Sequence, residues 1–175
     1  MPEELDLGEN LPFGTLAELK ISDCGWLTRL LPTLEAEQLR DLEVLEIIGC
    51  GVGSLHEVGH WAGTLRELTV WPGAGVVADI GSLPSLPKLE SLFCIDARGS
   101  LAPLRGMPAL RNVTLGAVEP IDLTPLRDLK NLERLELYGS TLFDPSPLMG
   151  REDLTIHLNE DGRVHPGPVP HGPLR

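Results

Sequence analysis

The chain has 175 residues, of which 42% are apolar, so it is long enough to form one domain with a continuous core. No apolar run reaches the length of a membrane helix, and residues 1–6 lack the basic region of a secretory signal. Twenty-six acidic residues against fourteen basic ones give a formal charge of −12, which argues against general binding to nucleic acid or anionic lipid. We therefore expect a cytoplasmic protein that binds neither nucleic acid nor membranes.

A six-residue phrase, Leu-x-x-Leu-x-Leu, returns every 21 to 26 residues along the chain. Each phrase is followed within a few positions by a small residue. The six phrases are Leu16, Leu19 and Ile21; Leu42, Leu45 and Ile47; Leu65, Leu68 and Val70; Leu89, Leu92 and Cys94; Leu110, Val113 and Leu115; and Leu132, Leu135 and Leu137. Six returns at nearly constant spacing predict a solenoid.

Each unit predicts a short strand followed by a tight return. The alternation in each phrase has period two, so the apolar residues point inward, the residues between them point to the opposite face, and the stacked strands form one parallel sheet. The return segments contain apolar pairs three residues apart: Leu27 and Leu30, Leu55 and Val58, Ile80 and Leu83, Leu101 and Leu104, and Leu123 and Leu126. Because prolines fall in several of these segments, one turn of 3₁₀ or short helix is expected there.

The two ends of the chain depart from the repeat. Residues 5–10 resemble the second half of a unit whose first half is missing, and residues 33–39 insert a helical turn or two into the first full unit. The last strand, residues 154–158, alternates correctly but leaves the register of the repeat. We predict a solenoid of about six to seven repeats, the first one partial, over residues 1–159, and a disordered Pro/Gly-rich tail over residues 160–175.

The unit at residues 110–131 carries both signals in full. It is similar to the short repeat class of bacterial internalins, and the chain resembles a leucine-rich-repeat protein over roughly residues 5–158. The resemblance implies an α/β fold, in which a curved solenoid has a parallel β-sheet on its concave side and short 3₁₀ or helical turns and loops on its convex side. The asparagine ladder of that family is replaced here by small residues.

The cysteines suit packing better than chemistry. Cys24 and Cys50 lie eight residues after the first leucine of their phrases, where other units have Gly73, Ala97, Val118 and Ser140. We expect small buried side chains at this bend, where a thiol behaves as a small hydrophobe. The chain has no Cys-x-x-Cys pair, so we predict no zinc or redox site and no cofactor.

His56, Glu57 and His60 form a literal H-E-x-x-H motif. On a long helix this spacing holds zinc between two imidazoles with the glutamate as general base. In the repeat, however, the motif falls on a one-turn return segment, with His56 and Glu57 in positions expected to face solvent. A minimal zinc-dependent hydrolase is therefore kept only as the alternative function, and we predict no catalytic or metal-binding residues.

The outward positions of the strands form two columns across the predicted sheet. The first column holds Lys20, Glu46, Thr69, Phe93, Thr114 and Glu136, and the second holds Ser22, Ile48, Trp71, Ile95, Gly116 and Tyr138. Ile48, Trp71, Phe93 and Ile95 would form an exposed apolar patch, which usually marks an interaction site. Packing beneath a neighbouring domain, or a local slip in the outward assignment, are the alternatives. Trp26 and Trp61 lie in return segments, where we expect convex-side packing.

We predict non-catalytic recognition of a protein partner on the concave face. The predicted contact residues are Glu46, Ile48, Thr69, Trp71, Phe93, Ile95, Glu136 and Tyr138. Acids at the rim (Glu18, Glu43, Glu46, Glu67, Glu133 and Glu136) would favour a basic segment of the partner, or of a neighbouring domain in the same polypeptide. The composition and the open N-terminal edge resemble the C-terminal repeat module of bacterial NACHT-type NTPases, which implies a sensor or regulatory role.

Overall fold

The structure is a computed structural model that describes residues 16–30 and 39–159. The partial repeat predicted at residues 5–10, all but the last residue of the insertion predicted at residues 33–39, and the tail predicted at residues 160–175 lie outside the described residues. The rest of the predicted solenoid can be compared with the structure directly.

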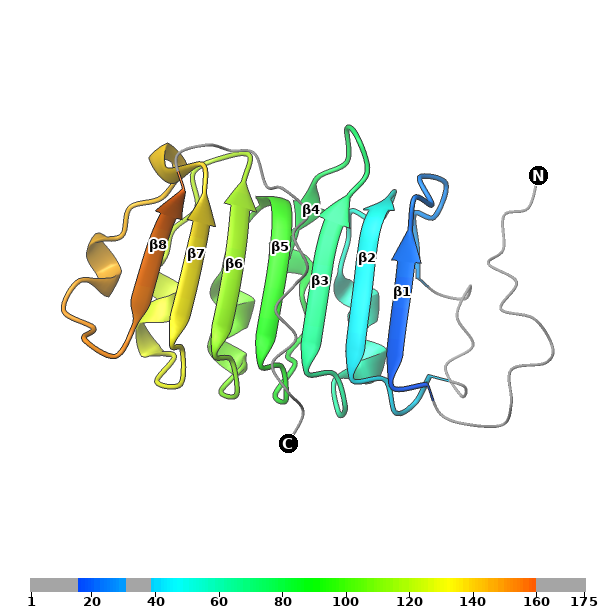
Figure 1. Cartoon of the computed structure of the whole chain (residues 1–175), viewed down its shortest axis with the longest axis horizontal. Helices are drawn as coiled ribbons and strands as arrows, with labels where there is room; N and C mark the ends of the chain where they lie inside the picture. The colour runs from blue at the N-terminus through cyan, green and yellow to red at the C-terminus, as the bar shows by residue number, and fades with distance from the viewer. Residues whose placement is uncertain (1–15, 31–38, 160–175) are drawn as a thin grey trace.

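The described residues form one parallel sheet with strands in chain order (Figure 1). Its main path runs through β1 (Glu18–Ser22), β2 (Val44–Cys50), β3 (Glu67–Pro72), β5 (Ser91–Arg98), β6 (Asn112–Ala117), β7 (Arg134–Tyr138) and β8 (Thr155–Asn159). A two-residue strand, β4 (Ala78–Asp79), pairs with β5 off this path. The sheet does not close on itself, so the predicted solenoid architecture is confirmed.

The pairing register follows the leucine phrases. Leu45 pairs with Leu19 on one side and with Leu68 on the other, and the same alignment continues through Leu92 and Val113. From the second phrase to the sixth, every residue of the apolar phrase is at most 1% exposed. Burying each of these large side chains contributes about 1.5–3 kcal/mol, and the burial comes from neighbouring coils rather than from the unit itself.

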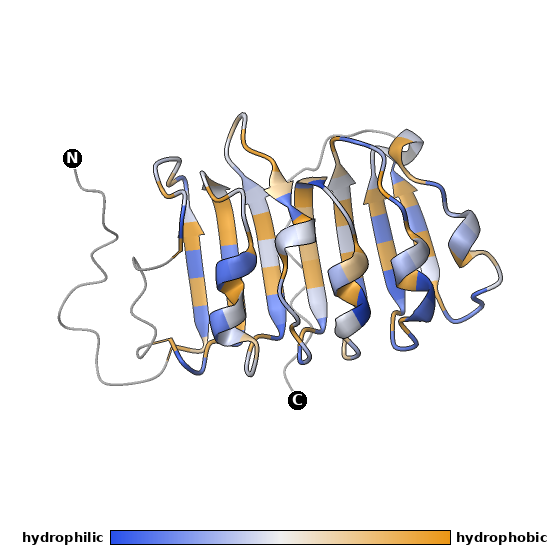
Figure 2. Ribbon diagram, turned by 180° about the vertical axis from the view of Figure 1, so that it is seen from behind, coloured by the Kyte–Doolittle hydropathy of each residue, from blue (hydrophilic) through white to orange (hydrophobic). Residues whose placement is uncertain are grey.

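Short 3₁₀ turns cover one face of the sheet, which Figure 2 shows from the side of the turns. They are η1 (His56–Trp61), η2 (Ile80–Ser82), η3 (Ala102–Gly106), η4 (Thr124–Asp128), η5 (Ser140–Leu142) and η6 (Ser146–Leu148). A proline stands in the first two positions of η3, η4 and η6, where its missing N–H costs no hydrogen bond. The apolar pairs of the return segments are all buried, as the spacing predicts.

A polar residue precedes most of these turns and caps them. Asp79, Asp122 and Asp144 each accept a hydrogen bond from the backbone N–H two residues later, at 3.0, 2.8 and 2.9 Å. Ser100 takes the same role with the N–H of Ala102 at 3.1 Å. Because the caps satisfy backbone donors within the coil, each return can be tight without a long helix.

Three expectations need correction. The last strand was predicted to leave the register of the repeat, but β8 pairs with β7 in register along its whole length. The pairs run from Arg134 with Thr155 to Tyr138 with Asn159. Trp26 is 47% exposed, whereas Trp61 is buried as expected. The bend position buries Cys50 and Ala97, but Val118 is 47% exposed there, so this position tolerates an outward side chain.

Candidate functional site

The face of the sheet opposite the turns is the concave face, and it carries the two predicted columns. The pairing places Lys20, Glu46, Thr69, Phe93, Thr114, Glu136 and His157 side by side across seven strands. Ser22, Ile48 and Trp71 pair in the second column, as do Gly116, Tyr138 and Asn159. The predicted contact residues other than Ile95, which falls in a register shift of β5, therefore share one face, and none of the apolar side chains in the set belongs to the core cluster between sheet and turns.

The apolar half of this face lies over β2, β3 and β5. Ile48, Trp71 and Phe93 are half-buried, so part of each side chain is open to a partner. Ile95 differs from the prediction, because it is only 6% exposed although it lies outside the core cluster. A Cβ on Gly116 would stand 3.0 Å from Cδ1 of Ile95, which shows that Ile95 leans across the neighbouring strand where glycine leaves room. Ile95 therefore packs against the neighbouring strand and offers little surface to a partner.

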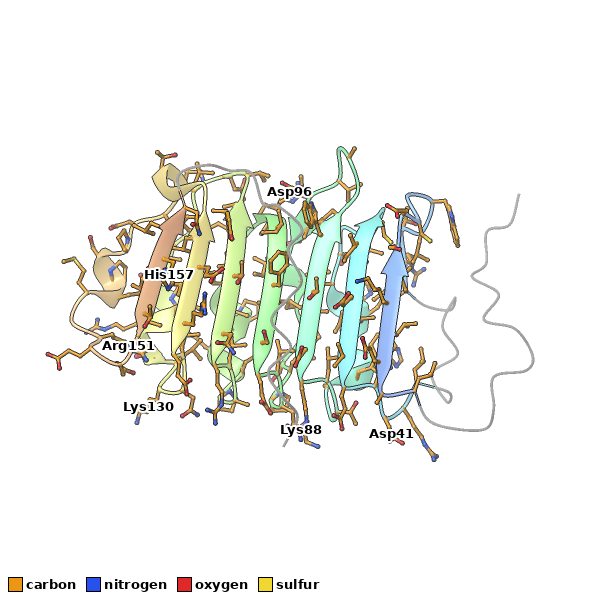
Figure 3. The ribbon with its side chains drawn as sticks, in the orientation of Figure 1. Asp41, Lys88, Asp96, Lys130, Arg151 and His157 are labelled. Atoms are coloured by element: carbon orange, nitrogen blue, oxygen red, sulfur yellow. The ribbon has the colours of Figure 1, made fainter. Side chains whose placement is uncertain are left out.

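The polar half lies over β6, β7 and β8. Arg134 donates from Nε to Oε1 of Glu136 at 2.8 Å, and Tyr138 is half-buried at the end of the same strand. His157 lies beside Glu136 on β8, where Figure 3 labels it on the open face of the sheet. The sequence-based prediction missed Arg134 and His157. Full register of β8 with β7 is the signal that would have found His157.

The predicted acidic rim is largely paired within the protein. Nζ of Lys20 lies 2.7 Å from Oε2 of Glu46, whose side chain is 6% exposed. The hydrogen bond with Glu46 is the main reason that the pKa of Lys20 is raised above its ordinary value. Glu46 and Thr69 are both buried, so these two predicted contact residues have little surface to offer a partner.

Acidic and basic side chains alternate in a ladder at the edge where the strands begin. Glu43, Arg66, Glu90, Arg111 and Glu133 occupy one repeat position in successive coils with alternating charge. Arg66 pairs with Glu43 at 3.7 Å and also with Glu90, and Arg111 pairs with Glu133 at 3.0 Å. Glu43 and Glu133 therefore stabilise neighbouring coils instead of forming an unpaired rim. That they attract a basic partner stays a prediction, and any such partner would meet carboxylates that already have a basic neighbour.

The H-E-x-x-H motif lies on η1, and its three side chains have different surroundings. Glu57, predicted to face solvent, is 6% exposed. Its Oε2 accepts a hydrogen bond from the backbone N–H of Leu30 at 2.6 Å, and its Oε1 accepts one from Nε of Arg29 at 2.8 Å. Nδ1 of His56 lies 3.0 Å from the hydroxyl of Ser54. Glu57 thus joins its coil to the preceding one.

The geometry of η1 does not suit a zinc site of the kind the motif predicts. In a 3₁₀ helix with three residues per turn, positions four apart point in directions about 120° apart, so His56 and His60 do not share a face. Within residues 16–30 and 39–159, no three His, Cys, Asp or Glu side chains are grouped as metal ligands. The motif is accounted for by the packing of the return segment.

The same described segments contain no helix with the length and apolarity that a membrane crossing needs.

Comparison with known proteins supports the fold. No protein-family model matches the chain, and no curated protein matches its sequence. Among solved structures, the chain is similar to the internalin InlF from Listeria monocytogenes, with a TM-score of 0.55 and 20% identity over 83% of this chain and 48% of that one. It is also similar to internalin C2 from the same organism, with a TM-score of 0.53 and 19% identity over 80% of this chain and 67% of that one.

The chain thus spans about half the length of the first of these internalins and two thirds of the second. At this level of identity the similarity shows the fold, which is a leucine-rich-repeat solenoid as the repeat predicts.

Proposed function

We propose that this solenoid is a non-catalytic module that recognises a protein partner on its concave face. The observation that carries the proposal is that Ile48 and the paired Trp71, together with Phe93 in the adjacent column, lie on three adjacent strands on the side of the sheet away from the core. A surface with no binding role would be expected to have polar side chains in these positions. Tryptophan and other large apolar side chains at the centre of a face are the usual anchors of protein interfaces.

The two halves of the face have complementary roles in this proposal. The half-buried Trp71 and Phe93 side chains would bury apolar area against the partner at little cost in side-chain entropy, because they are already held by their neighbours. Tyr138, Glu136 and His157 would hydrogen-bond to polar groups of the partner and set its orientation. A partner segment lying across the strands would meet both halves.

The charge of the concave face favours a basic segment. Its charged residues are Glu18, Glu46, Glu67 and Glu136 against Lys20 and Arg134, which is four acids against two bases. Glu46 and Glu136 are paired, whereas no ion pair between described residues includes Glu18 or Glu67. Glu67 begins β3 at the N-terminal end of the apolar half, and Glu18 begins the adjoining β1, so a lysine or arginine of the partner next to its apolar anchor would find a counter-charge.

The sequence also suggests a wider setting, in which the module is the cytoplasmic sensor or regulatory domain of a larger NACHT-type NTPase. Composition and the pattern of the repeat are its support. An open reading frame that encodes an NTPase domain together with these repeats is the expected finding. A gene that encodes the repeats with an unrelated domain would contradict this setting and leave the recognition function untouched.

Affinity measurements with matched variants test the recognition function. Proteins captured by the immobilised chain from a lysate of its source organism would be identified by mass spectrometry, purified, and titrated against the wild type by calorimetry. Replacing both anchors, Trp71→Ala and Phe93→Ala, should weaken binding at least tenfold, since loss of each anchor costs about 1–2 kcal/mol. Trp26→Ala is the control, because that indole is exposed on a return segment.

Two results would contradict the proposal: equal affinity of the double variant and the wild type, or a comparable loss in Trp26→Ala. Circular dichroism and thermal melting of each variant would establish that the solenoid is intact.

A further inference from the structure

Cys24 and Cys50 occupy the same repeat position in two successive coils. The pairing of β1 with β2 aligns Ser22 with Ile48, and the backbone N–H of Asp23 continues it by donating to the carbonyl of Ile48 at 2.9 Å. Neighbouring chains in a sheet lie about 4.8 Å apart. A disulfide needs Cα atoms roughly 4.4–6.8 Å apart, so the two coils run at a separation that it can bridge.

The two thiols also point in the same direction. Each donates a weak hydrogen bond to the carbonyl two residues earlier, Cys24 to Ser22 at 3.3 Å and Cys50 to Ile48 at 3.4 Å. Sγ of Cys50 additionally lies 3.8 Å from the carbonyl oxygen of Ile21, so it leans toward the preceding coil. Both sulfur atoms therefore lie close to the carbonyl groups where β1 and β2 end, and Sγ of Cys50 lies on the side of its coil that faces Cys24.

We propose that Cys24 and Cys50 form an intramolecular disulfide that cross-links the first two described coils when the protein meets a disulfide oxidant such as oxidised glutathione. Cys24 is the accessible member of the pair, because it is half-buried whereas Cys50 is fully buried. Cys24 therefore reacts first with the oxidant, and Cys50 completes the bond.

The reaction is a pair of thiol–disulfide exchanges. The Cys24 thiolate attacks one sulfur of oxidised glutathione, forming a mixed disulfide and releasing one glutathione thiolate. The Cys50 thiolate then attacks Sγ of Cys24, and the second glutathione leaves as the Cys24–Cys50 bond forms. The two protein thiols lose two protons and two electrons, and one oxidised glutathione becomes two reduced molecules.

The second exchange depends on pH. Burial is the main reason that the pKa of Cys50 is raised above its ordinary value, and it outweighs a backbone hydrogen bond from Cys24 that acts in the opposite direction. Less of Cys50 is therefore thiolate near neutral pH than of an exposed cysteine, and ring closure accelerates as the pH rises. Burial raises the pKa of Cys94 to about 12, so that thiol stays unreactive and serves as an internal reference.

Intact-protein mass spectrometry of the folded full chain tests the proposal. After incubation with oxidised glutathione at mildly alkaline pH, the wild type should lose two hydrogens, keep one thiol, and yield a linked peptide pair containing Cys24 and Cys50. Cys50→Ala should stop at one glutathione adduct on Cys24. Cys24→Ser should keep both remaining thiols, and Cys94→Ser should still form the disulfide.

A wild-type protein that keeps three thiols under these conditions would overturn the proposal. A wild-type protein that accumulates the glutathione adduct on Cys24, or that forms disulfides only between chains, would overturn it as well. The result is independent of the partner-binding function, because the two cysteines are not among its contact residues.

Discussion

Glu57 is a carboxylate whose main contacts lie in the preceding coil. It accepts the backbone N–H of Leu30 and the guanidinium of Arg29 across 27 and 28 residues of sequence. Leu30 is fully buried, so its N–H has no access to water if the carboxylate is removed. One side chain thereby satisfies a backbone donor that a one-turn return segment leaves open.

Removing this carboxylate should destabilise the protein. We expect Glu57→Ala to lower the free energy of unfolding by about 1–3 kcal/mol, the usual cost of leaving a buried donor unsatisfied. Glu57→Gln should cost less, because its amide oxygen can still accept from Leu30. Urea denaturation followed by circular dichroism measures both, and His60→Ala on the exposed side of η1 is the control, with a change within about 0.5 kcal/mol. Equal stabilities of Glu57→Ala and His60→Ala would contradict this role.

The aspartate caps make stability depend on pH. Hydrogen bonds with Thr124 and Ser146 lower the pKa values of Asp122 and Asp144 below that of a free aspartate. A lowered pKa in the folded state gives stability that is present above the unfolded pKa, near 4, and is lost as the pH falls through the folded value. The wild type should therefore lose stability below about pH 4.

Asparagine variants isolate this contribution. Asp122→Asn and Asp144→Asn keep an oxygen that can accept the backbone N–H but have no carboxyl group to protonate. The double variant should show a shallower decline of the denaturation midpoint between about pH 5 and pH 2.5 than the wild type. Asp41→Asn is the control, because Asp41 is exposed and does not precede any of the described 3₁₀ turns. A decline as steep as that of the wild type would contradict the assignment.

At the scale of the coil, close backbone approach fixes how tightly adjacent units stack. A Cβ placed on Gly51 would stand 2.5 Å from the carbonyl oxygen of Gly25 and 3.1 Å from that of Leu27, in the preceding coil. These are backbone atoms that cannot turn aside as a flexible side chain can. Gly51 is therefore required by the spacing between coils.

We expect Gly51→Ala to cost about 1–3 kcal/mol of stability, the usual penalty for overpacking a tight contact. Gly63→Ala is the matched control, since no atom outside its immediate chain neighbours lies within 4 Å of a Cβ there. Thermal melting of the two variants measures the difference. The stacking argument fails if Gly51→Ala melts within a degree of Gly63→Ala.

The strand pattern could be predicted from sequence because its cause is local. Period-two alternation places Leu68 and Val70 in the core and Thr69 and Trp71 on the other face, and no distant residue is needed to see it. The cap position is also visible in the sequence, as Ser or Asp recurs before η2, η3, η4 and η6. Recurrent capping residues at a fixed repeat position are as regular a signal as the leucines.

Other features could not be predicted because their causes lie in the adjacent coil. Glu57 is buried by a backbone donor of the preceding unit, and Ile95 is covered because Gly116 on the next strand has no side chain. The ion pair of Lys20 with Glu46 likewise depends on which residues face one another across strands. Sequence patterning located the candidate face, whereas its charge balance and accessible surface required the pairing register.

At the scale of the whole molecule, the contacts that stabilise the solenoid lie apart from the face proposed to bind a partner. The core leucines lie between the sheet and the return segments, which also contain the turns and their caps. The charge ladder lies along the edge where the strands begin. The concave face has a different composition, with apolar side chains over β2, β3 and β5 and polar ones over β6, β7 and β8. Changes on this face should therefore alter the proposed binding while leaving the core contacts that hold neighbouring coils together.

Site-specific photocrosslinking tests the central claim, that the concave face binds a protein partner. A benzophenone amino acid would replace Thr114, next to Phe93 on that face, or the exposed Ala102 on η3, in otherwise identical chains. We predict that the probe at position 114 crosslinks one partner from lysate, that excess wild-type protein suppresses the product, and that adding Trp71→Ala reduces its yield severalfold. The account is contradicted if the probe at position 102 captures the same partner equally well, or if the yield of the product at 114 is unchanged by Trp71→Ala.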